Sequence, residues 1–226
     1  RSLRAVVISG EGEHFCSGLD VAAVMKKPSN IIKLLFKWLP GNQNLAQKVV
    51  LGWQDLSIPV IAKVTGHCFG GGMQIALGAD YRIVDKNAKL AIMEARWGLC
   101  PDMGANVVLA GLMKRDQALW LASHAGPVSA EDAKEYGLVT QLTDDVDKQT
   151  DAVLETLMAR SPDTLAAIKR ITQQSYRSQQ RKILAKETWS QIRLLMNPNT
   201  KKAIAKAKGE EDIQFNNAKS WKAKVA

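Results

Sequence analysis

Short apolar runs and segments of helical spacing alternate along the first two thirds of the chain. The runs at 3–9, 59–64, 81–84, 89–92 and 138–142 are brief and rich in Val, Ile and Leu, as buried strands are. Apolar residues at helical spacing follow several of these runs. Strands that alternate with helices predict an α/β core.

Helices are predicted between these strands and along the whole last third of the chain. Ser129 and Ser161 stand at N-cap positions, and Pro162 suits a first helical turn. We therefore divide the chain into an α/β core at 1–146 and a helical C-terminal element at 147–226. The predicted helices of the core are at 20–25, 31–39, 44–56, 73–78 and between Gly104 and Ser123.

The composition is that of a globular protein. Hydrophobic residues make up 46% of the 226 and charged residues 23%, which is enough for one sizeable core. No apolar run approaches the roughly 20 residues that span a bilayer. The three cysteines are far apart without a C-x-x-C pair, so neither a disulfide framework nor a zinc site is indicated and a reducing, cytoplasmic compartment fits best. Because the first strand begins almost at Arg1, we expect further residues to precede it.

The formal net charge of +9 favours anionic partners. Nucleic acid is one class of partner with this preference, and a small molecule that carries phosphates is another. A solvated helical face explains the basic residues equally well. They are densest near the end of the chain, at Lys201, Lys202, Lys206, Lys208, Lys219, Lys222 and Lys224.

Two loops that join a strand to a helix could bind an anionic oxygen. Gly70, Gly71 and Gly72 let the backbone approach a ligand closely, and the first N–H groups of the following helix lack partners inside it. The segment 14–20 is a second loop of this kind, with Gly18 before its helix. Together the loops could direct two N–H groups at one carbonyl oxygen, the minimum oxyanion hole. Tight packing of strand against helix is the alternative interpretation of the glycines.

Three sequence blocks, in this order, carry a more specific signal. They are F-C-S-G-L-D at 15–20, G-H-C-F-G-G-G-M-Q-I-A-L-G-A-D at 66–80 and L-A-I-M-E-A-R-W-G-L-C-P-D-M-G at 90–104. With S-A-E-D-A at 129–133 and a late D-I-Q-F at 212–215, they resemble the crotonase (enoyl-CoA hydratase/isomerase) superfamily over nearly the whole chain. The resemblance implies a spiral core of short strands and helices, an acyl-coenzyme A thioester as substrate, and no metal or redox cofactor.

Carried over by position, the resemblance makes the backbone N–H groups of Leu19 and Gly71 the donors of the oxyanion hole. Hydratases of the family activate a water with two glutamates. Glu94 matches one of them, but Gln74 stands in place of the other, and glutamine cannot take a proton from water. Asp102 matches an additional aspartate of the dienoyl-CoA isomerases. We therefore favour isomerisation of a double bond over hydration.

Both carboxylates also have a plainer interpretation. Glu94 could form a partly buried ion pair with Arg96 or Arg82. Asp102 could cap the helix that begins near Gly104. In either case the residue would stabilise the fold and would not act on a substrate.

The resemblance assigns binding residues as well. Phe36 and Trp38 fall in the region that covers the acyl pocket in the family, although core packing is the ordinary interpretation of such aromatic residues. Phe215 and Lys219 match positions that help enclose the adenine end of coenzyme A. Because the tail helices make trimers in the family, we expect a homotrimer or a dimer of trimers.

Two rivals to an isomerase stay open. The first is an enoyl-CoA hydratase in which Gln74 orients a water and Glu94 alone serves as acid and base. The second is a binding protein, either an RNA-binding homologue of the hydratases or a catalytically weak binder of coenzyme A. The aromatic and glycine signature of an RNA-recognition fold is missing from the sequence, so nucleic acid is the less favoured partner.

Overall fold

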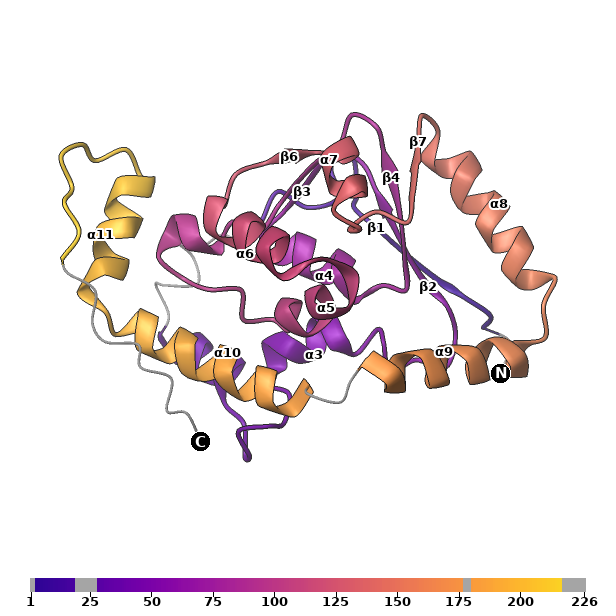
Figure 1. Cartoon of the computed structure of the whole chain (residues 1–226), viewed down its shortest axis with the longest axis horizontal. Helices are drawn as coiled ribbons and strands as arrows, with labels where there is room; N and C mark the ends of the chain where they lie inside the picture. Colours follow the sequence, from indigo (N-terminus) through magenta and orange to yellow (C-terminus); the bar gives the residue numbers. More distant parts are fainter. Residues whose placement is uncertain (1–2, 19–27, 177–179, 217–226) are drawn as a thin grey trace.

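The structure of the chain is a computed structural model that describes residues 3–18, 28–176 and 180–216. Short strands form two small sheets in these ranges, and helices surround the sheets (Figure 1). The strands are β1 (Val6–Ser9), β2 (Val60–Val64), β3 (His67–Phe69), β4 (Tyr81–Asp85), β5 (Lys89–Ala91), β6 (Val128–Ser129) and β7 (Gln141–Thr143). The helices are α2 (Pro28–Leu35), α3 (Leu45–Leu51), α4 (Gly71–Gly78), the 3-10 helix η1 (Glu94–Trp97), α5 (Ala105–Leu112), α6 (Arg115–His124), α7 (Ala130–Glu135), α8 (Val146–Met158), α9 (Pro162–Tyr176), α10 (Gln180–Leu195) and α11 (Pro198–Ala207).

The larger sheet is wholly parallel and has the order β1-β2-β4-β7. Its central strands are covered on both faces, which explains why they are continuous apolar runs in the sequence. The smaller sheet has the order β3-β5-β6, with β3 parallel and β6 antiparallel to β5. A parallel bridge between Cys16 and Cys68 joins the first loop of the chain to this second sheet. The α/β core of short strands and helices expected from the sequence is confirmed.

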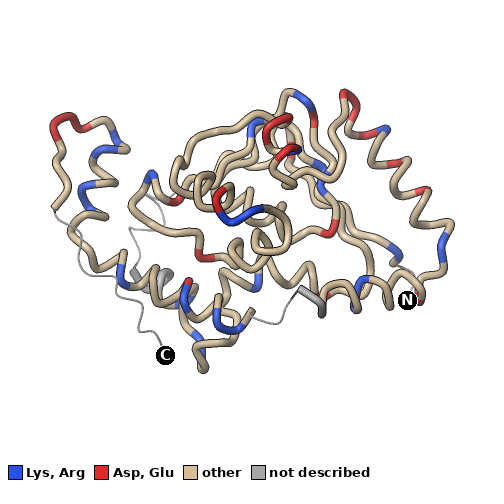
Figure 2. Tube along the Cα trace, viewed as in Figure 1, with Lys and Arg blue, Asp and Glu red and all other residues tan. Residues whose placement is uncertain are grey.

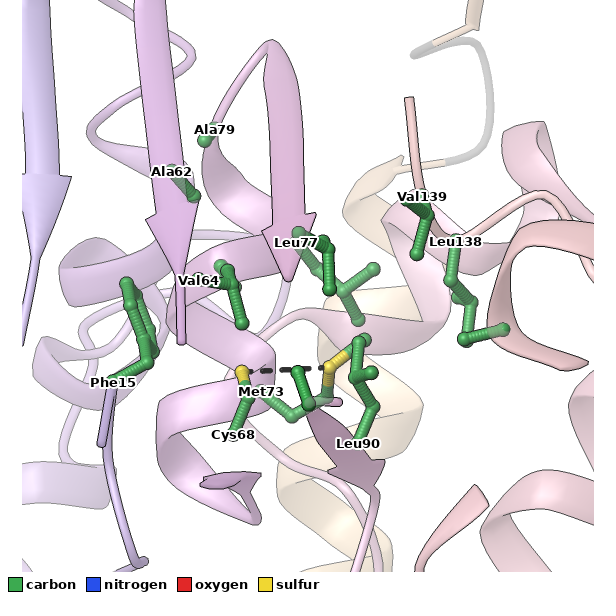
Figure 3. Close-up of a cluster of buried hydrophobic side chains, with 14 of the residues drawn as sticks. Phe15, Ala62, Val64, Cys68, Met73, Leu77, Ala79, Leu90, Leu138 and Val139 are labelled. Atoms are coloured by element: carbon green, nitrogen blue, oxygen red, sulfur yellow. Dashed lines mark hydrogen bonds between the residues drawn. The ribbon is translucent and has the colours of Figure 1, made fainter. Parts of the chain in front are cut away.

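Helix α4 occupies the centre of the core. Met73 extends from it between Cys68 and Leu90, and its sulfur lies 3.8 Å from Sγ of Cys68 (Figure 3). Leu77, one turn further along, is fully buried beside β4. A helix that is apolar on nearly every side must be enclosed in this way. The first turn of α4 is therefore held rigidly, and the glycine loop leads into it.

The C-terminal helices pack directly on the core. Ile61 of β2 and Ile83 of β4 contact Leu157 of α8, which covers one face of the larger sheet (Figure 1). Lys169 of α9 forms an ion pair with Asp80, with Nζ 2.7 Å from Oδ2. Figure 2 shows Lys and Arg along α10 and α11 as well as on the core helices. The division of the chain at 146 and 147 stays a prediction.

Several predicted elements differ in their bounds. His67–Phe69, interpreted as part of the glycine loop, forms strand β3 because β5 and Cys16 supply pairing partners that no local pattern reveals. Leu138 and Val139 are buried in a loop, and the last strand covers Gln141–Thr143 instead. The predicted helix at 20–25 lies outside the described residues. None of the described helices is long and apolar enough to cross a membrane.

Candidate active site

The glycine loop brings the start of α4 next to Glu94. Gly70 has φ 54°, a left-handed value that favours glycine, and its carbonyl accepts the first helical hydrogen bond, from Gln74 N at 3.0 Å. The N–H of Gly71 precedes that bond and so has no partner inside the helix. A Cβ on Gly70 would lie 3.9 Å from Oε1 of Glu94, so the carboxylate borders this loop. The loop can therefore present an N–H group to an oxygen beside Glu94.

The third glycine of the run serves packing instead. A Cβ on Gly72 would lie 2.3 Å from Cβ of Cys16, which is far closer than two such atoms approach. The packing interpretation of the glycines is therefore correct for Gly72. Packing does not explain Gly70. A glycine is favoured at position 70 because the backbone there has a positive φ.

Gln74 connects the glycine helix to both carboxylate-bearing segments. Its side chain is fully buried, and Nε2 donates a hydrogen bond of 2.6 Å to Oε1 of Glu94. Its Oε1 accepts one of 3.1 Å from the backbone N–H of Met103, next to Asp102. These two partners fix which way the amide faces. Position 74 is thus a structural bridge within the site and not a residue of the helix surface.

Glu94 opens the 3-10 helix η1 and keeps one oxygen without a protein partner. Its Oε2 is buried from solvent and accepts no hydrogen bond from any described residue. Buried carboxylate oxygens are normally hydrogen-bonded, so an unpaired one is a candidate for chemistry. Burial raises the pKa of Glu94 above its ordinary value, and interactions with its own backbone, with Gln74 and with the backbone of Met93 only partly oppose this. A carboxylate with a raised pKa is a stronger base than an ordinary one.

The ion-pair interpretation of Glu94 is wrong. Arg82 is buried and donates to the carbonyls of Leu138 and Ala79, at 2.6 and 2.8 Å. No ion pair found between described residues includes Glu94. Arg82 therefore stabilises the backbone at Ala79 and Leu138, and the side-chain partner of Glu94 is Gln74.

Asp102 lies in the loop between η1 and α5, half-buried. Burial above all, and then the nearby charges of Glu94 and Glu187, raise the pKa of its carboxyl to about 7. The helix-cap interpretation of Asp102 is wrong, because α5 has Gly104 as its N-cap and no side chain of its own capping it. Glu187 of α10 binds there instead, accepting hydrogen bonds from the N–H groups of Gly104 and Asn106.

Glu187 is a residue of this site that the sequence did not reveal. It is 4% exposed, yet an acidic residue among lysines and glutamines in a helix has the appearance of surface charge. Within the described part of the chain, no group of three or more His, Cys, Asp or Glu residues is arranged to hold a metal ion.

The predicted acyl-pocket residues lie together but not with the carboxylates. Phe36 and Trp38 have ring centroids 6.1 Å apart and are 60% and 88% exposed, so core packing is wrong for both. They line a groove of about 730 Å³ with Lys37 and Arg181. The described residues that line this groove do not include the carboxylates of the site.

The remaining predicted residues are only partly described. Phe215 is 53% exposed, and Nζ of Lys206 lies 5.8 Å from the centre of its ring. Leu19 and Lys219 lie outside the described residues. The second donor of the oxyanion hole and the predicted lysine contact to coenzyme A therefore stay predictions.

Comparisons with known proteins show which family the chain resembles. Residues 1–217 match the family model described as enoyl-CoA hydratase/isomerase. An enoyl-CoA hydratase of Mycobacterium tuberculosis is 30% identical over 170 residues, covering 74% of this chain and 62% of the relative. The alpha subunit of a fatty acid oxidation complex of Pseudomonas savastanoi pv. phaseolicola is 30% identical over 139 residues, covering 61% of this chain and 19% of the relative. The chain thus spans less than two thirds of the length of either relative.

A solved structure supports the fold. The crystal structure of an enoyl-CoA hydratase from Mycobacterium avium subsp. paratuberculosis superposes with a TM-score of 0.78. The match covers 95% of this chain and 81% of the other, at 24% sequence identity. At that identity the likeness concerns the fold and not the reaction.

Proposed function

The chain belongs to the enoyl-CoA hydratase/isomerase family, and we propose that it moves a double bond along an enoyl- or dienoyl-coenzyme A thioester. One observation carries this choice of reaction. Both ends of the Gln74 amide are engaged, by Glu94 and by the N–H of Met103. An amide cannot accept the proton of a water. The two-carboxylate arrangement that would activate water is therefore incomplete at position 74.

The proposed reaction needs one base, one oxyanion donor and one site of reprotonation. Glu94 removes a proton from the carbon next to the thioester, and the C–H electron pair passes into a dienolate. The thioester oxygen then carries the negative charge and accepts hydrogen bonds from the N–H of Gly71 and, by resemblance, of Leu19. A donor of this kind contributes on the order of 3 kcal/mol in the transition state. Glu94 or Asp102 returns a proton further along the chain, so no atom is gained or lost.

The ionisation of the two carboxylates supports a division of labour. Asp102, with a pKa of about 7, retains a proton below that pH because burial and the charge of Glu94 both favour the neutral acid, and the proposal takes Glu94 as the charged partner. A base and an acid then face the same substrate at one pH. The two groups interact, so the measured values belong to the pair.

Hydration is the second candidate, and the names of the relatives favour it. Both the Mycobacterium tuberculosis relative and the superposed structure are called enoyl-CoA hydratases. In that case Gln74 would orient a water and Glu94 alone would act as acid and base. Turnover of purified protein on 2-enoyl-, 3-enoyl- and 3,5-dienoyl-coenzyme A distinguishes the two. Rapid migration of the double bond without water addition supports isomerisation, and water addition alone overturns it.

Assembly into a homotrimer or a dimer of trimers is part of the proposal. Trp189 of α10 is 62% exposed, and Met196, just beyond its end, is 71% exposed. Ile168 of α9 is 56% exposed. Large apolar side chains on neighbouring helices are typical of surfaces that another subunit covers.

A further inference from the structure

We propose that Glu187 is a positioning residue, which from helix α10 fixes the loop that carries Asp102 and acts on that carboxyl through its charge. The inference rests on the proposed function, in which Asp102 handles a proton. The evidence for the role of Glu187 is separate from the evidence that Glu94 is the base, because it comes from contacts between helix α10 and the loop.

Both oxygens of Glu187 bind the end of the loop. Oε2 accepts from the N–H of Gly104 at 3.0 Å, and Oε1 accepts from the N–H of Asn106 at 3.1 Å. The side chain of Asn106 extends the clamp, since its Nδ2 donates to Oε1 of Glu187 at 3.0 Å and to the carbonyl of Pro101 at 3.2 Å. Asp102 thus lies between two residues, Pro101 and Gly104, that are both tied to this carboxylate.

The rest of the loop is held by neighbouring groups in the same way. Gln191, one turn along α10 from Glu187, accepts from the N–H of Cys100 at 3.2 Å. Gln74 accepts from the N–H of Met103. The backbone is therefore anchored at two residues on either side of Asp102, namely Cys100, Pro101, Met103 and Gly104. Helix α10 supplies the partners of two of these residues.

A buried polar network holds Glu187 itself in place. Nε2 of Gln47, in α3, donates to its Oε2 at 3.3 Å. Asn44, the N-cap of α3, donates to the hydroxyl of Thr188, the next residue of α10. The carboxylate of Glu187 is thus held by residues of α3 and α5 as well as by its own helix α10. Because its position is fixed in this way, it can fix the position of the loop that it binds.

Glu187 binds as the charged carboxylate. Its four hydrogen-bond partners are all N–H donors, so a proton on either oxygen would have no acceptor. Burial raises its pKa, and these bonds oppose that shift. The charged or titratable groups that act on Glu187 and Asp102 are Lys37, Glu94 and Cys100. No ion pair neutralises Glu187 among the residues described, so its charge reaches Asp102.

The variant Glu187→Gln tests the proposal because it keeps the shape and removes the charge. We expect kcat for isomerisation to fall on the order of 10-fold or more, with KM nearly unchanged, because misplaced groups mainly affect the transition state. We also expect the pH at which Asp102 titrates to fall, since a like charge has gone. The matched control is Glu155→Gln on the exposed side of α8, which should change neither quantity. NMR on carboxyl-labelled protein measures the titration of Asp102. A titration that is the same in wild type and Glu187→Gln overturns the inference.

Asn106→Ala provides a second test if Glu187→Gln does not fold. It removes the link from Glu187 to Pro101 and leaves the charge of Glu187 in place. We expect kcat to fall while the titration of Asp102 stays near that of the wild type, and an unchanged kcat contradicts the positioning role. The NMR titration also separates this inference from the proposed function. A wild type that does not isomerise but whose Asp102 responds to Glu187→Gln refutes only the reaction, whereas an active wild type with an unresponsive Asp102 refutes only the positioning role.

Discussion

Nε2 of Gln74 lies 2.6 Å from Oε1 of Glu94 and donates a hydrogen bond to it. The bond favours the charged form of Glu94, whereas burial favours the neutral form and is the larger effect. Glu94 is therefore oriented through Oε1, whereas Oε2 is buried and has no hydrogen-bond partner among the described groups. In the proposed reaction this unpaired oxygen is the one that takes the proton of the substrate.

Glu94→Gln should abolish most activity and preserve the fold. Glutamine has nearly the same shape and can still accept from Gln74, but it cannot act as a base. We expect kcat/KM to fall at least about 100-fold, the low end of what general acid–base catalysis contributes. Steady-state kinetics on a panel of acyl-coenzyme A substrates measures this. Binding of coenzyme A, followed by calorimetry, should be nearly unaffected, and wild-type turnover on every substrate would mean that Glu94 is structural.

The pH profile should report the proton on Asp102. Because the proposed reaction uses Glu94 charged and Asp102 protonated, activity should decline as the pH rises through about 7. In Asp102→Asn the remaining activity should no longer decline in that range. The profile of kcat/KM for both proteins measures the effect. An alkaline limb that survives unchanged in the variant would assign the titration to another group.

The same carboxyl should make stability depend on pH. Its pKa is about 7 in the folded protein against an ordinary 3.8, so the folded state binds the proton more tightly than the unfolded state does. The resulting stabilisation is complete at low pH and is lost as the pH rises through the folded value. Asparagine resembles the protonated acid at every pH. The Tm of Asp102→Asn relative to wild type should therefore increase between about pH 4 and about pH 8, and a difference independent of pH would contradict this.

The sequence revealed those parts of the site that lie in local blocks. The glycine loop and Gln74 lie in one short block of sequence and Glu94 lies in another, so each can be recognised from its neighbours along the chain. The structure brings the two blocks together. Glu187 could not be found in this way, because its partners Gly104 and Asn106 lie about 80 positions earlier and its own helix shows no unusual pattern. A contact between distant segments leaves no periodic signal in one sequence.

The same distinction holds for the fold. Strands β2 and β4 were recognised because burial on both faces demands continuous apolar runs. Strand β3 was not, because its three residues owe their extended form to pairing with β5 and to Cys16. Phe36 and Trp38 were assigned to an acyl pocket by the resemblance, with core packing as the alternative from residue type, yet both are largely exposed beside a groove. Residue type predicts burial well only where a periodic pattern accompanies it.

The exposed apolar residues of the tail should mediate assembly. Sedimentation at micromolar concentration should show a trimer or a dimer of trimers. Trp189→Asp should shift the population to smaller species, because a charge would have to be buried at a subunit contact. The exposed Lys186 on the same helix provides the control Lys186→Asp. A wild type that sediments as a clean monomer would contradict the assembly, and an unaffected Trp189→Asp would place the contact elsewhere.

Gln74→Glu should shift the enzyme towards hydration. The variant places a second carboxylate 2.6 Å from Oε1 of Glu94 while its other oxygen can still accept from the N–H of Met103. Two carboxylates so close cannot both ionise, so the pair retains a proton and the pKa of one member rises. One member can then deprotonate a water while the other donates a proton, which is the pairing that the wild type lacks.

We expect hydration of a short 2-enoyl-coenzyme A by this variant to increase relative to migration of the double bond. Both reactions are measured on the same protein, by loss of the conjugated thioester and by chromatography of the isomers. Gln74→Met is the matched control, because it removes the hydrogen bond to Glu94 and adds no carboxylate, and it should lower migration without increasing hydration. Brisk hydration by the wild type, with Gln74→Glu no better, would favour the hydratase over the isomerase. In that event the amide at position 74 would orient water, and Glu94 would alone be responsible for both proton transfers.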